Sequence, residues 1–389
     1  MNSLRIEPAV TWGTRRQFIN LPAQIHARDS RWVPSLRCEE KRLLGFVPGH
    51  PLPKEKPVQA WLAFRGKQPV GRIAASCCLA PQNPSNQAVG YFGFFECFND
   101  PEAARLLVQT AAQWVGQHGL EYLRGPMSPS INYSVGVLTN GFDRQPSFQI
   151  PYNPNYYEEL LVHAGLRSVQ ELYALEIFRD HMSRNVDRLE RVGNHFSGRH
   201  SVRFRQLNRK NRHSDLQLFL SIAQQSLMSH WGFVPLSERE QKRLAIDMSW
   251  LVVPELLQFA EVNGQVVAAA LALPDYADRI REIDGKLFPT GFFRLLMGKQ
   301  RIKNFRVVAT NILPNFKRWG LAPALIGRIS RIALSMGAEK LEFSWIAQSN
   351  PLSFGTIENG GAQRSKTLKV YEAACAELLA YTGNGTTVL

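Results

Sequence analysis

The sequence lacks the long hydrophobic runs that a membrane-spanning helix needs, because no stretch approaches 18 uninterrupted apolar residues. Its first residues, Met1 to Glu7, hold no apolar core of a secretory signal. The five cysteines form no CxxC pair and no spacing with histidine that suits a metal. We therefore expect a cytoplasmic protein with reduced thiols and no metal.

Common catalytic motifs are also missing. There is no G-x-S-x-G nucleophile turn, no P-loop and no dinucleotide-binding glycine pattern. What is present is a composition of 44% apolar and 20% charged residues over 389 positions. These values are typical of a folded chain with two domains.

Half of the net charge of +14 lies in one segment. Between Arg179 and Arg212 there are ten basic and three acidic residues. Such a segment can face a phosphorylated cofactor, an acidic carrier protein, an anionic membrane or nucleic acid, or it can be a solvated connection between domains.

The same order of predicted elements occurs twice. Asn263-Gly264 predicts a tight hairpin turn in the second half, and Asp100-Pro101 predicts a helix start in the first. The first half has predicted strands at 4–7, 58–64, 69–76, 89–96, 120–124 and 171–178, and helices at 14–27, 101–118 and 155–163. The second half has predicted strands at 201–207, 256–262, 265–273, 305–313, 340–345 and 367–372, and helices at 214–229, 322–336 and 351–358. We therefore predict an α/β chain with mixed sheets: a first domain at 1–178, a basic linker at 179–198 and a second domain at 199–389.

One junction in the second half has the features of an anion site. The apolar strand at 305–313 leads into Lys317 and Arg318, then Gly320, and a helix follows at once. The first amides of a helix have no partner within the helix, and the helix dipole adds positive charge there. A strand, a basic loop and a helix in this order favour the binding of a phosphate group.

This junction and the repeated order resemble the GNAT N-acyltransferase fold, present twice. The family pattern is (Arg/Gln)-x-x-Gly-x-(Gly/Ala), and Lys317 to Ala322 fits it with lysine in the first place. The resemblance implies that this loop holds the pyrophosphate of acyl-CoA, with the pantetheine arm between two splayed strands, 305–313 and 340–345. The donor-binding residues implied are Leu313, Lys317, Arg318, Trp319, Gly320, Leu321, Ala322 and Asn350.

A closer resemblance is to bacterial proteins with two GNAT domains in one chain, some of which are similar to bacterial ceramide synthases. It covers most of the chain. The matching segments are Phe92-Gly93-Phe94-Phe95-Glu96, Arg124-Gly125-Pro126-Met127, Pro151-Tyr152-Asn153-Pro154, Trp231-Gly232-Phe233-Val234-Pro235 and Phe343-Ser344-Trp345-Ile346. The first half lacks the glycine loop, since Asp100 and Glu102 occupy its place. We expect one donor site, in the second half, and an acceptor side in the first.

Acyl transfer needs a base for the amine and a proton donor for the leaving thiol. Glu96 ends an aromatic strand, where burial is expected to raise its pKa, and the resemblance implies a base near this place. Its structural alternative is a salt bridge or a helix cap. Tyr371 and Tyr157 are candidate proton donors, and each can equally be a core tyrosine with a satisfied hydroxyl.

Acceptor recognition is predicted in the long segment from Gly125 to Pro154, because long loops in compact domains are usually functional. The predicted acceptor-contacting residues are Asn132, Tyr133, Asn153, Tyr157, His230 and Trp231.

Three functions are compatible with these observations. The first is an N-acyltransferase that moves an acyl group from acyl-CoA, or from an acyl carrier protein, to a small-molecule or lipid amine. It would be cytoplasmic, with peripheral contact to the anionic inner membrane for a lipid acceptor. The second is a Fem-like, aminoacyl-tRNA-dependent transferase, which the basic pI favours; the missing helical hairpin and the glycine loop argue against nucleic acid. The third is a non-catalytic binding or regulatory protein with this fold.

Overall fold

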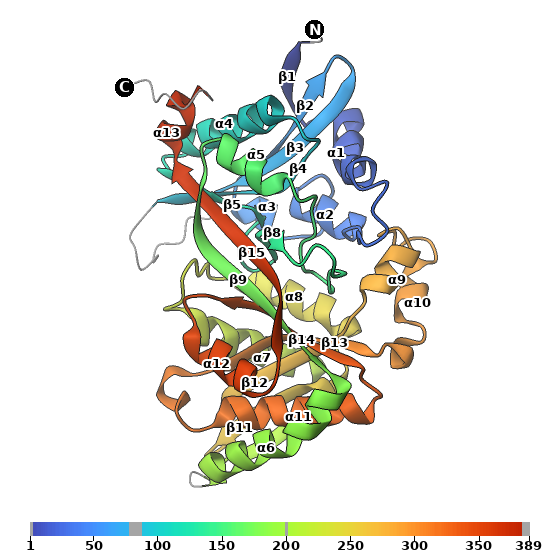
Figure 1. Cartoon of the computed structure of the whole chain (residues 1–389), viewed down its shortest axis with the longest axis vertical. Helices are drawn as coiled ribbons and strands as arrows, with labels where there is room; N and C mark the ends of the chain where they lie inside the picture. Colours follow the sequence, from blue (N-terminus) through green and yellow to red (C-terminus); the bar gives the residue numbers. More distant parts are fainter. Residues whose placement is uncertain (1–2, 78–87, 199–200, 383–389) are drawn as a thin grey trace. The chain divides into compact units, whose positions relative to one another are not determined.

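The computed structural model describes residues 3–77, 88–198 and 201–382 (Figure 1). It divides into two compact units. Unit 1 comprises residues 1–172, 279–291 and 366–389, and unit 2 comprises residues 173–278 and 292–365. Among the described residues no helix is both long enough and apolar enough to cross a bilayer, and no disulfide is formed.

Unit 1 has a mixed sheet with the strand order β1-β2-β3-β4-β5-β15, and β8 also pairs with β15, which comprises Gln363–Ala374. Its elements are β1 (Leu4–Pro8), α1 (Trp12–Ile25), α2 (Arg37–Leu43), α3 (Leu52–Glu55), β2 (Val58–Arg65), β3 (Gln68–Ser76), β4 (Val89–Cys97), α4 (Pro101–Gln117), β5 (Tyr122–Gly125), β6 (Met127–Ser128), β7 (Ser134–Val135), β8 (Val137–Asn140), α5 (Tyr157–His163) and α13 (Cys375–Ala380).

Two cores flank the sheet of unit 1, because side chains alternate along its strands. Trp61 and Ile73 point toward α4, while Leu62 and Ala74 point toward α1. Asp100 caps α4 as predicted, with its carboxylate accepting from the Ala103 amide at 3.1 Å.

Unit 2 has the strand order β10-β11-β12-β13-β14-β9. Its elements are α6 (Arg179–Gly198), β10 (Arg203–Gln206), α7 (Arg212–Leu227), α8 (Glu238–Leu251), η1 (Pro254–Leu256), β11 (Leu257–Val262), β12 (Gln265–Pro274), α10 (Gly291–Leu296, whose first residue belongs to unit 1), η2 (Lys299–Arg301), β13 (Asn304–Ile312), η3 (Pro314–Phe316), α11 (Leu321–Ser335), β14 (Lys340–Ala347) and α12 (Pro351–Asn359). The predicted hairpin is confirmed: β11 and β12 are joined by Asn263 and Gly264, which both have positive φ.

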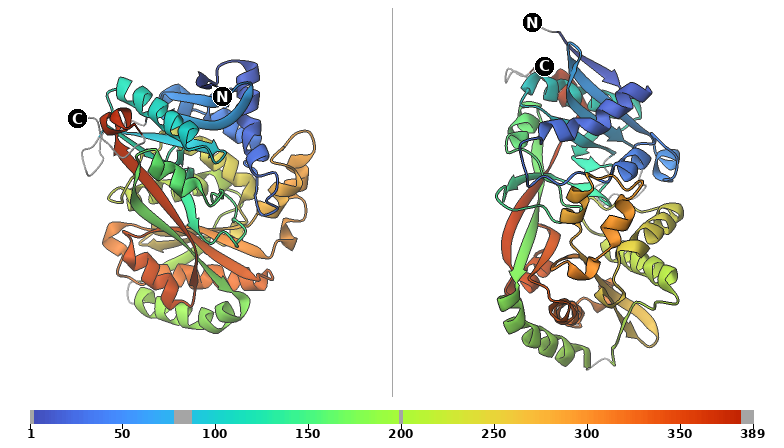
Figure 2. Two further views of the ribbon diagram at one scale, coloured as in Figure 1. Left: turned by 45° about the horizontal axis from the view of Figure 1, so that its top comes forward. Right: turned by 90° about the vertical axis from the view of Figure 1, so that its right-hand side faces the viewer.

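The core of unit 2 lies between α11 and the sheet. Leu325 and Ile329 of α11 meet Val307 of β13 and Leu341 of β14 there. Helix α6 packs beside α11 (Figure 2).

The predicted basic linker at 179–198 is instead the helix α6. It packs closely on α11, because a Cβ at Gly193 would lie 2.4 Å from the Cα of Ala324. Arg331 of α11 also forms ion pairs with Asp187 and Glu190 of α6.

The boundaries of the two units also differ from the predicted domain boundaries. Strands β9 (Arg167–Phe178), β15 (Gln363–Ala374) and helix α9 (Ala277–Glu282) each have residues in both units. The last strand of the sequence pairs with β5 of unit 1, with Tyr371 opposite Gly125. Each unit thus takes a strand from the opposite half of the sequence, and Tyr371 lies in unit 1.

Candidate functional site

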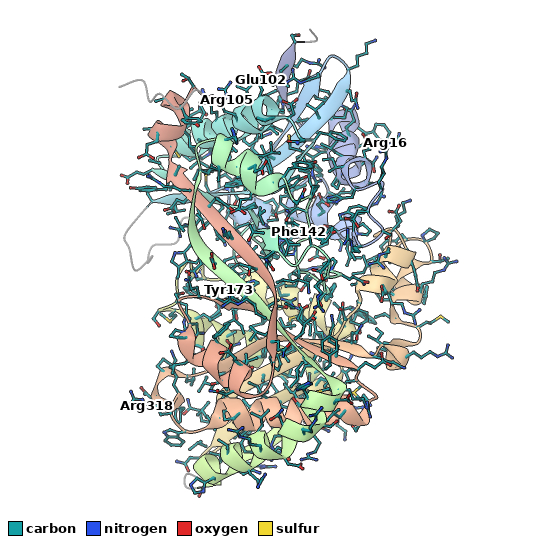
Figure 3. All side chains as sticks on the ribbon, viewed as in Figure 1. Arg16, Glu102, Arg105, Phe142, Tyr173 and Arg318 are labelled. Carbon is teal, nitrogen blue, oxygen red and sulfur yellow. The ribbon has the colours of Figure 1, made fainter. Side chains whose placement is uncertain are left out.

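The loop from Lys317 to Gly320 in unit 2 leaves the first amides of α11 available. Gly320 precedes the helix with φ +69°, a conformation that favours glycine, and no side chain caps the helix. Within the described residues, no hydrogen bond uses the amides of Gly320, Leu321 or Ala322. Lys317 and Arg318, which precede them in the chain, are exposed, and Arg318 is labelled in Figure 3. The geometry is that of an anion site at a helix N-terminus.

The other predicted donor residues make contacts within unit 2. The amide of Leu313 donates to Val267 at 2.9 Å. Trp319 packs edge-on against Phe316, with ring centroids 4.8 Å apart, at the margin of the unit 2 core. Asn350 caps α12 by accepting from the Ser353 amide at 3.3 Å. Pantetheine contact by Asn350 stays a prediction.

Beside this loop, β13 and β14 diverge, as the resemblance implied. Their parallel pairing joins Asn304 with Lys340 and ends at Val307 and Phe343, although both strands continue. A bulge in the pairing of β13 with β12 occurs at the same place, since Leu271 faces Ala309 and Ala272 faces Val307. The extra residue bends β13 away from β14. Among the described residues, no strand pairs with the β14 side of β13 beyond Val307, although the Ile312 amide donates to the Ser226 hydroxyl. The edge at 308–311 therefore suits an extended ligand with amide groups.

The corresponding place in unit 1 is filled by the chain itself. Strands β4 and β5 also stop pairing early, at Tyr91 and Arg124. Here β6 lies in contact with β4: a Cβ at Gly93 would be 2.0 Å from the Met127 carbonyl oxygen. The hydroxyl of Ser128 also accepts from the Phe94 amide at 2.8 Å. Because β6 occupies this position, an extended ligand has no equivalent space in unit 1.

The start of α4 in unit 1 also differs from the unit 2 loop in charge. Asp100 and Glu102 stand there, and both form ion pairs with Arg65. Within the described part of unit 1, neither the space nor the charge of the unit 2 site has a counterpart.

Two buried polar atoms beside the unit 2 loop have no hydrogen-bond partner among the described residues: Nδ1 of His230 and Nδ2 of Asn311. Asn311 lies on the diverging part of β13 and is 3% exposed. Burial and the charge of Lys317 lower the pKa of His230, so this side chain is neutral at pH 7 and lies near the loop. The end of α7 is held to β13 by Ser226, whose hydroxyl accepts from the Ile312 amide at 3.3 Å.

The structure thus brings His230, predicted as an acceptor contact, to the predicted donor loop. Its neighbour Trp231 is partly buried. Asn311 was missed by the sequence analysis. The sequence does not single it out, because the same strand also carries the polar residues Arg306 and Thr310.

Glu96 lies in a hydrogen-bonded cluster of unit 1. Its Oε2 accepts from the Tyr157 hydroxyl at 2.6 Å and lies 3.2 Å from Nε2 of His26. His26 stacks on Trp32 with ring centroids 4.9 Å apart. The Tyr157 hydroxyl also accepts from the Cys97 amide at 3.0 Å, so this tyrosine has both a donor and an acceptor partner.

The expectation of a raised pKa for Glu96 is wrong. Burial raises the pKa, but the hydrogen bond and charge of His26, the charge of Arg72 and the Tyr157 hydrogen bond together hold it below its usual value. The sequence showed the aromatic neighbours of Glu96 but not these partners from distant positions. Glu96 is therefore a weaker base than expected.

The lowered pKa predicts an acid-sensitive contribution of Glu96 to stability. The carboxyl has its ordinary pKa of about 4.3 in the unfolded chain. Between that value and the lower folded value, the unfolded chain binds the proton and the folded chain does not, so stability falls as pH falls through this window. In Glu96→Gln we expect a smaller decrease in Tm between about pH 5 and pH 3 than in the parent. Equal slopes of Tm against pH would show that the carboxyl contributes nothing there.

The remaining predicted site residues lie in unit 1. Tyr371 is fully buried, and its hydroxyl donates to Glu158 at 2.9 Å. Burial and this hydrogen bond raise the pKa of Tyr371 far above its usual range. Tyr371 is thus a core tyrosine with a satisfied hydroxyl, and proton donation to a thiol has no support in this arrangement.

The predicted acceptor segment is not one long loop, because it contains β6, β7 and β8. Asn153 accepts from the Leu138 amide at 2.8 Å and donates to the carbonyls of Leu138 and Pro154. Its side chain therefore fixes β8 and has a structural explanation. The hydroxyl of Tyr133 lies 3.2 Å from Nε2 of His50, and the Asn132 amide donates to the Ser130 hydroxyl. Acceptor contacts by Asn132 and Tyr133 stay predictions.

No family model matches the chain. It is 29% identical over 393 aligned positions to a protein named bacterial ceramide synthase from Caulobacter vibrioides, covering 95% of this chain and 97% of that one. It is 26% identical to protein YghO of Escherichia coli, covering 92% of each.

Among solved structures, a tandem GNAT protein from the clavulanic acid biosynthesis pathway matches 96% of this chain and 99% of its own, with a TM-score of 0.53 at 11% identity. A probable N-acyltransferase from Enterococcus faecalis matches 98% of this chain and 74% of its own, with a TM-score of 0.53 at 10% identity. The repeated element order, the diverging strands and these neighbours agree, and the chain has the tandem GNAT fold.

Proposed function

We propose that this chain is an N-acyltransferase that moves an acyl group from acyl-CoA, bound by unit 2, to an amine. The observation that carries the proposal is the combination of free helix-start amides at Gly320 with the unpaired edge of β13 in the same unit. One feature suits a pyrophosphate and the other suits an extended amide-containing arm.

The acceptor we propose is a lipid amine, such as a sphingoid base. This choice is supported by the ceramide synthase name of the Caulobacter relative, which aligns along nearly the whole chain. The reaction is attack of the amine nitrogen on the thioester carbon. The C–N bond forms, the C–S bond breaks, and the amine proton must pass to a base.

In unit 2, we assign His230 as the group that accepts this proton, directly or through water. Its lowered pKa keeps it neutral at pH 7, and its Nδ1 has no partner among the described residues. Asn311 would donate through Nδ2 to an oxygen of the donor in the space beside β13. The amides at Gly320 and the charges of Lys317 and Arg318 would hold the phosphates.

The choice of base can be tested by comparing His230→Gln with Glu96→Gln. We expect His230→Gln to lower kcat about 100-fold or more with little change in KM for acyl-CoA, because a positioned base contributes about 10²–10⁴-fold. His213→Gln is the matched control, since His213 is an exposed histidine at the other end of α7.

The assay is release of free CoA thiol in the presence of a sphingoid amine. If Glu96→Gln lowers turnover as strongly and His230→Gln does not, the base is the carboxylate in unit 1. If turnover occurs only with an acylated carrier protein, the donor is that carrier protein and not acyl-CoA. Salt-dependent binding of tRNA without acyl-CoA binding would favour the Fem-like alternative instead.

A further inference from the structure

Large apolar side chains are exposed together on α8 and α10 of unit 2, which are labelled in Figure 1. Trp250 is 53% exposed, Phe293 66% and Met297 68%. Trp250 contacts Phe292 with ring centroids 5.4 Å apart, and Phe292 contacts Phe293 at 6.0 Å. The rings therefore form one continuous surface, which we call the α8–α10 face. Exposed apolar groups that cluster in this way mark an interaction site more often than scattered ones do.

Positive charge borders this face. The guanidinium of Arg212 donates to the carbonyl of Ser249 at 2.9 Å, directly before Trp250. Lys299 follows Met297 closely in the chain and lies near both Arg209 and Arg212. Burial and these two arginines lower its pKa, while Glu255 opposes the shift.

The negative charge within this cluster is small. Glu255 forms an ion pair with Arg209. The positive charges of Arg212 and Lys299 therefore exceed the negative charge of this cluster. Arg294 of α10 and Arg301 of η2 are exposed as well. Cations that repel one another are stabilised by an anionic partner.

We propose that the α8–α10 face docks onto the surface of an anionic lipid bilayer. Phe293 and Met297 would enter the interfacial region, where apolar side chains are stabilised, and Trp250 would lie at headgroup level. Arg209, Arg212 and Lys299 would contact lipid phosphates. The inference goes beyond acyl transfer and holds whatever reaction the chain performs.

Charge favours a bilayer over a second copy of this chain as the occupant. In a symmetric dimer the same patch meets itself. That pairing would bring the Arg209–Arg212–Lys299 cluster toward its own copy, and like charges oppose it. An anionic membrane instead offers negative charge beside an apolar layer, which matches both parts of the face.

The test is co-sedimentation of the full chain with vesicles of phosphatidylcholine alone or mixed with phosphatidylglycerol. We expect binding to the mixed vesicles that weakens as salt rises. The apolar variant Phe293→Ser/Met297→Ser should bind at least about tenfold more weakly, by loss of buried apolar area. The charge variant Arg209→Gln/Arg212→Gln/Lys299→Gln should bind about 100-fold more weakly, from three cations near the surface.

Two control variants alter exposed residues elsewhere in unit 2. Leu352→Ser removes an apolar residue of α12 that is 76% exposed. Arg184→Gln/Arg188→Gln/Arg191→Gln removes three exposed cations of α6. Neither should change vesicle binding.

The proposal is overturned if the parent does not bind the mixed vesicles, or if the controls weaken binding as much as the face variants. Light scattering of the same proteins provides a second check. Dimerisation that Phe293→Ser/Met297→Ser abolishes, without vesicle binding by the parent, would assign the face to a second copy of the chain. Because no acyl transfer is measured, failure here is distinct from failure of the proposed reaction.

Discussion

Gly320→Asp is expected to abolish binding of acyl-CoA. Gly320 has φ +69° directly before α11, so any side chain is strained there. The aspartate would also place a negative charge at the amides proposed to hold the pyrophosphate. Loss of charge-assisted hydrogen bonds and the added repulsion together predict at least about 100-fold weaker binding, equivalent to about 3 kcal/mol. The measurement is isothermal titration with a long-chain acyl-CoA.

Gly337→Asp is the matched control for this change. Gly337 also has positive φ, +85°, and follows the other end of the same helix, where an added Cβ would meet nothing within 4 Å. The two variants carry the same substitution and a similar backbone strain. We expect Gly337→Asp to bind acyl-CoA like the parent. Equal affinities of parent and Gly320→Asp would rule out the phosphate role of this loop.

Arg72→Met is expected to destabilise unit 1 by about 3–5 kcal/mol. Arg72 is 3% exposed and Glu40 is 5% exposed. The guanidinium of Arg72 donates to the carboxylate of Glu40 and, at 2.8 Å, to the carbonyl of Phe18. Removing the arginine leaves a buried carboxylate without its cation. Burial already raises the pKa of Glu40, and Arg72 opposes that rise.

Urea unfolding followed by circular dichroism measures this effect. Arg5→Met is the control, because its ion pair with Glu7 has both side chains at least 40% exposed, and such pairs contribute about 1 kcal/mol or less. Arg72→Met/Glu40→Leu should recover most of the loss, since the buried Glu40 carboxylate is removed together with its cation. If Arg72→Met is as stable as the parent, the Arg72–Glu40 ion pair does not hold α2 to the sheet.

The order of elements could be predicted from local signals. Asp100-Pro101 starts a helix and Asn263-Gly264 closes a hairpin through short-range chemistry that any context preserves. The helix α6 escaped prediction because its many arginines obscure a buried stripe that includes Met182 and Val186. A basic amphipathic helix and a solvated basic connection share the same composition.

Pairing partners could not be predicted in the same way. Leu368, Val370 and Tyr371 of β15 are buried. Such a run of apolar residues could pair with the sheet of either half. Strand register and partner depend on tertiary packing rather than on the strand's own residues. For that reason the last strand could not be assigned to unit 1 from its sequence.

The candidate site was predictable where chemistry is local and not where it depends on distant residues. Lys317 to Ala322 forms a continuous motif, so its position at a helix start followed from the sequence. The environment of Glu96 depends on His26 and Arg72, which no spacing rule connects to it. Asn311 is a candidate because its side-chain nitrogen is buried without a partner among the described residues, which depends on tertiary packing.

Native mass spectrometry of the chain with a long-chain acyl-CoA tests the central claim most directly. We propose a single donor site, in unit 2, because β6 fills the corresponding space in unit 1. We therefore expect a complex with one acyl-CoA per chain that disappears in Gly320→Asp. Two bound molecules per chain, or one that persists in Gly320→Asp, would contradict the account.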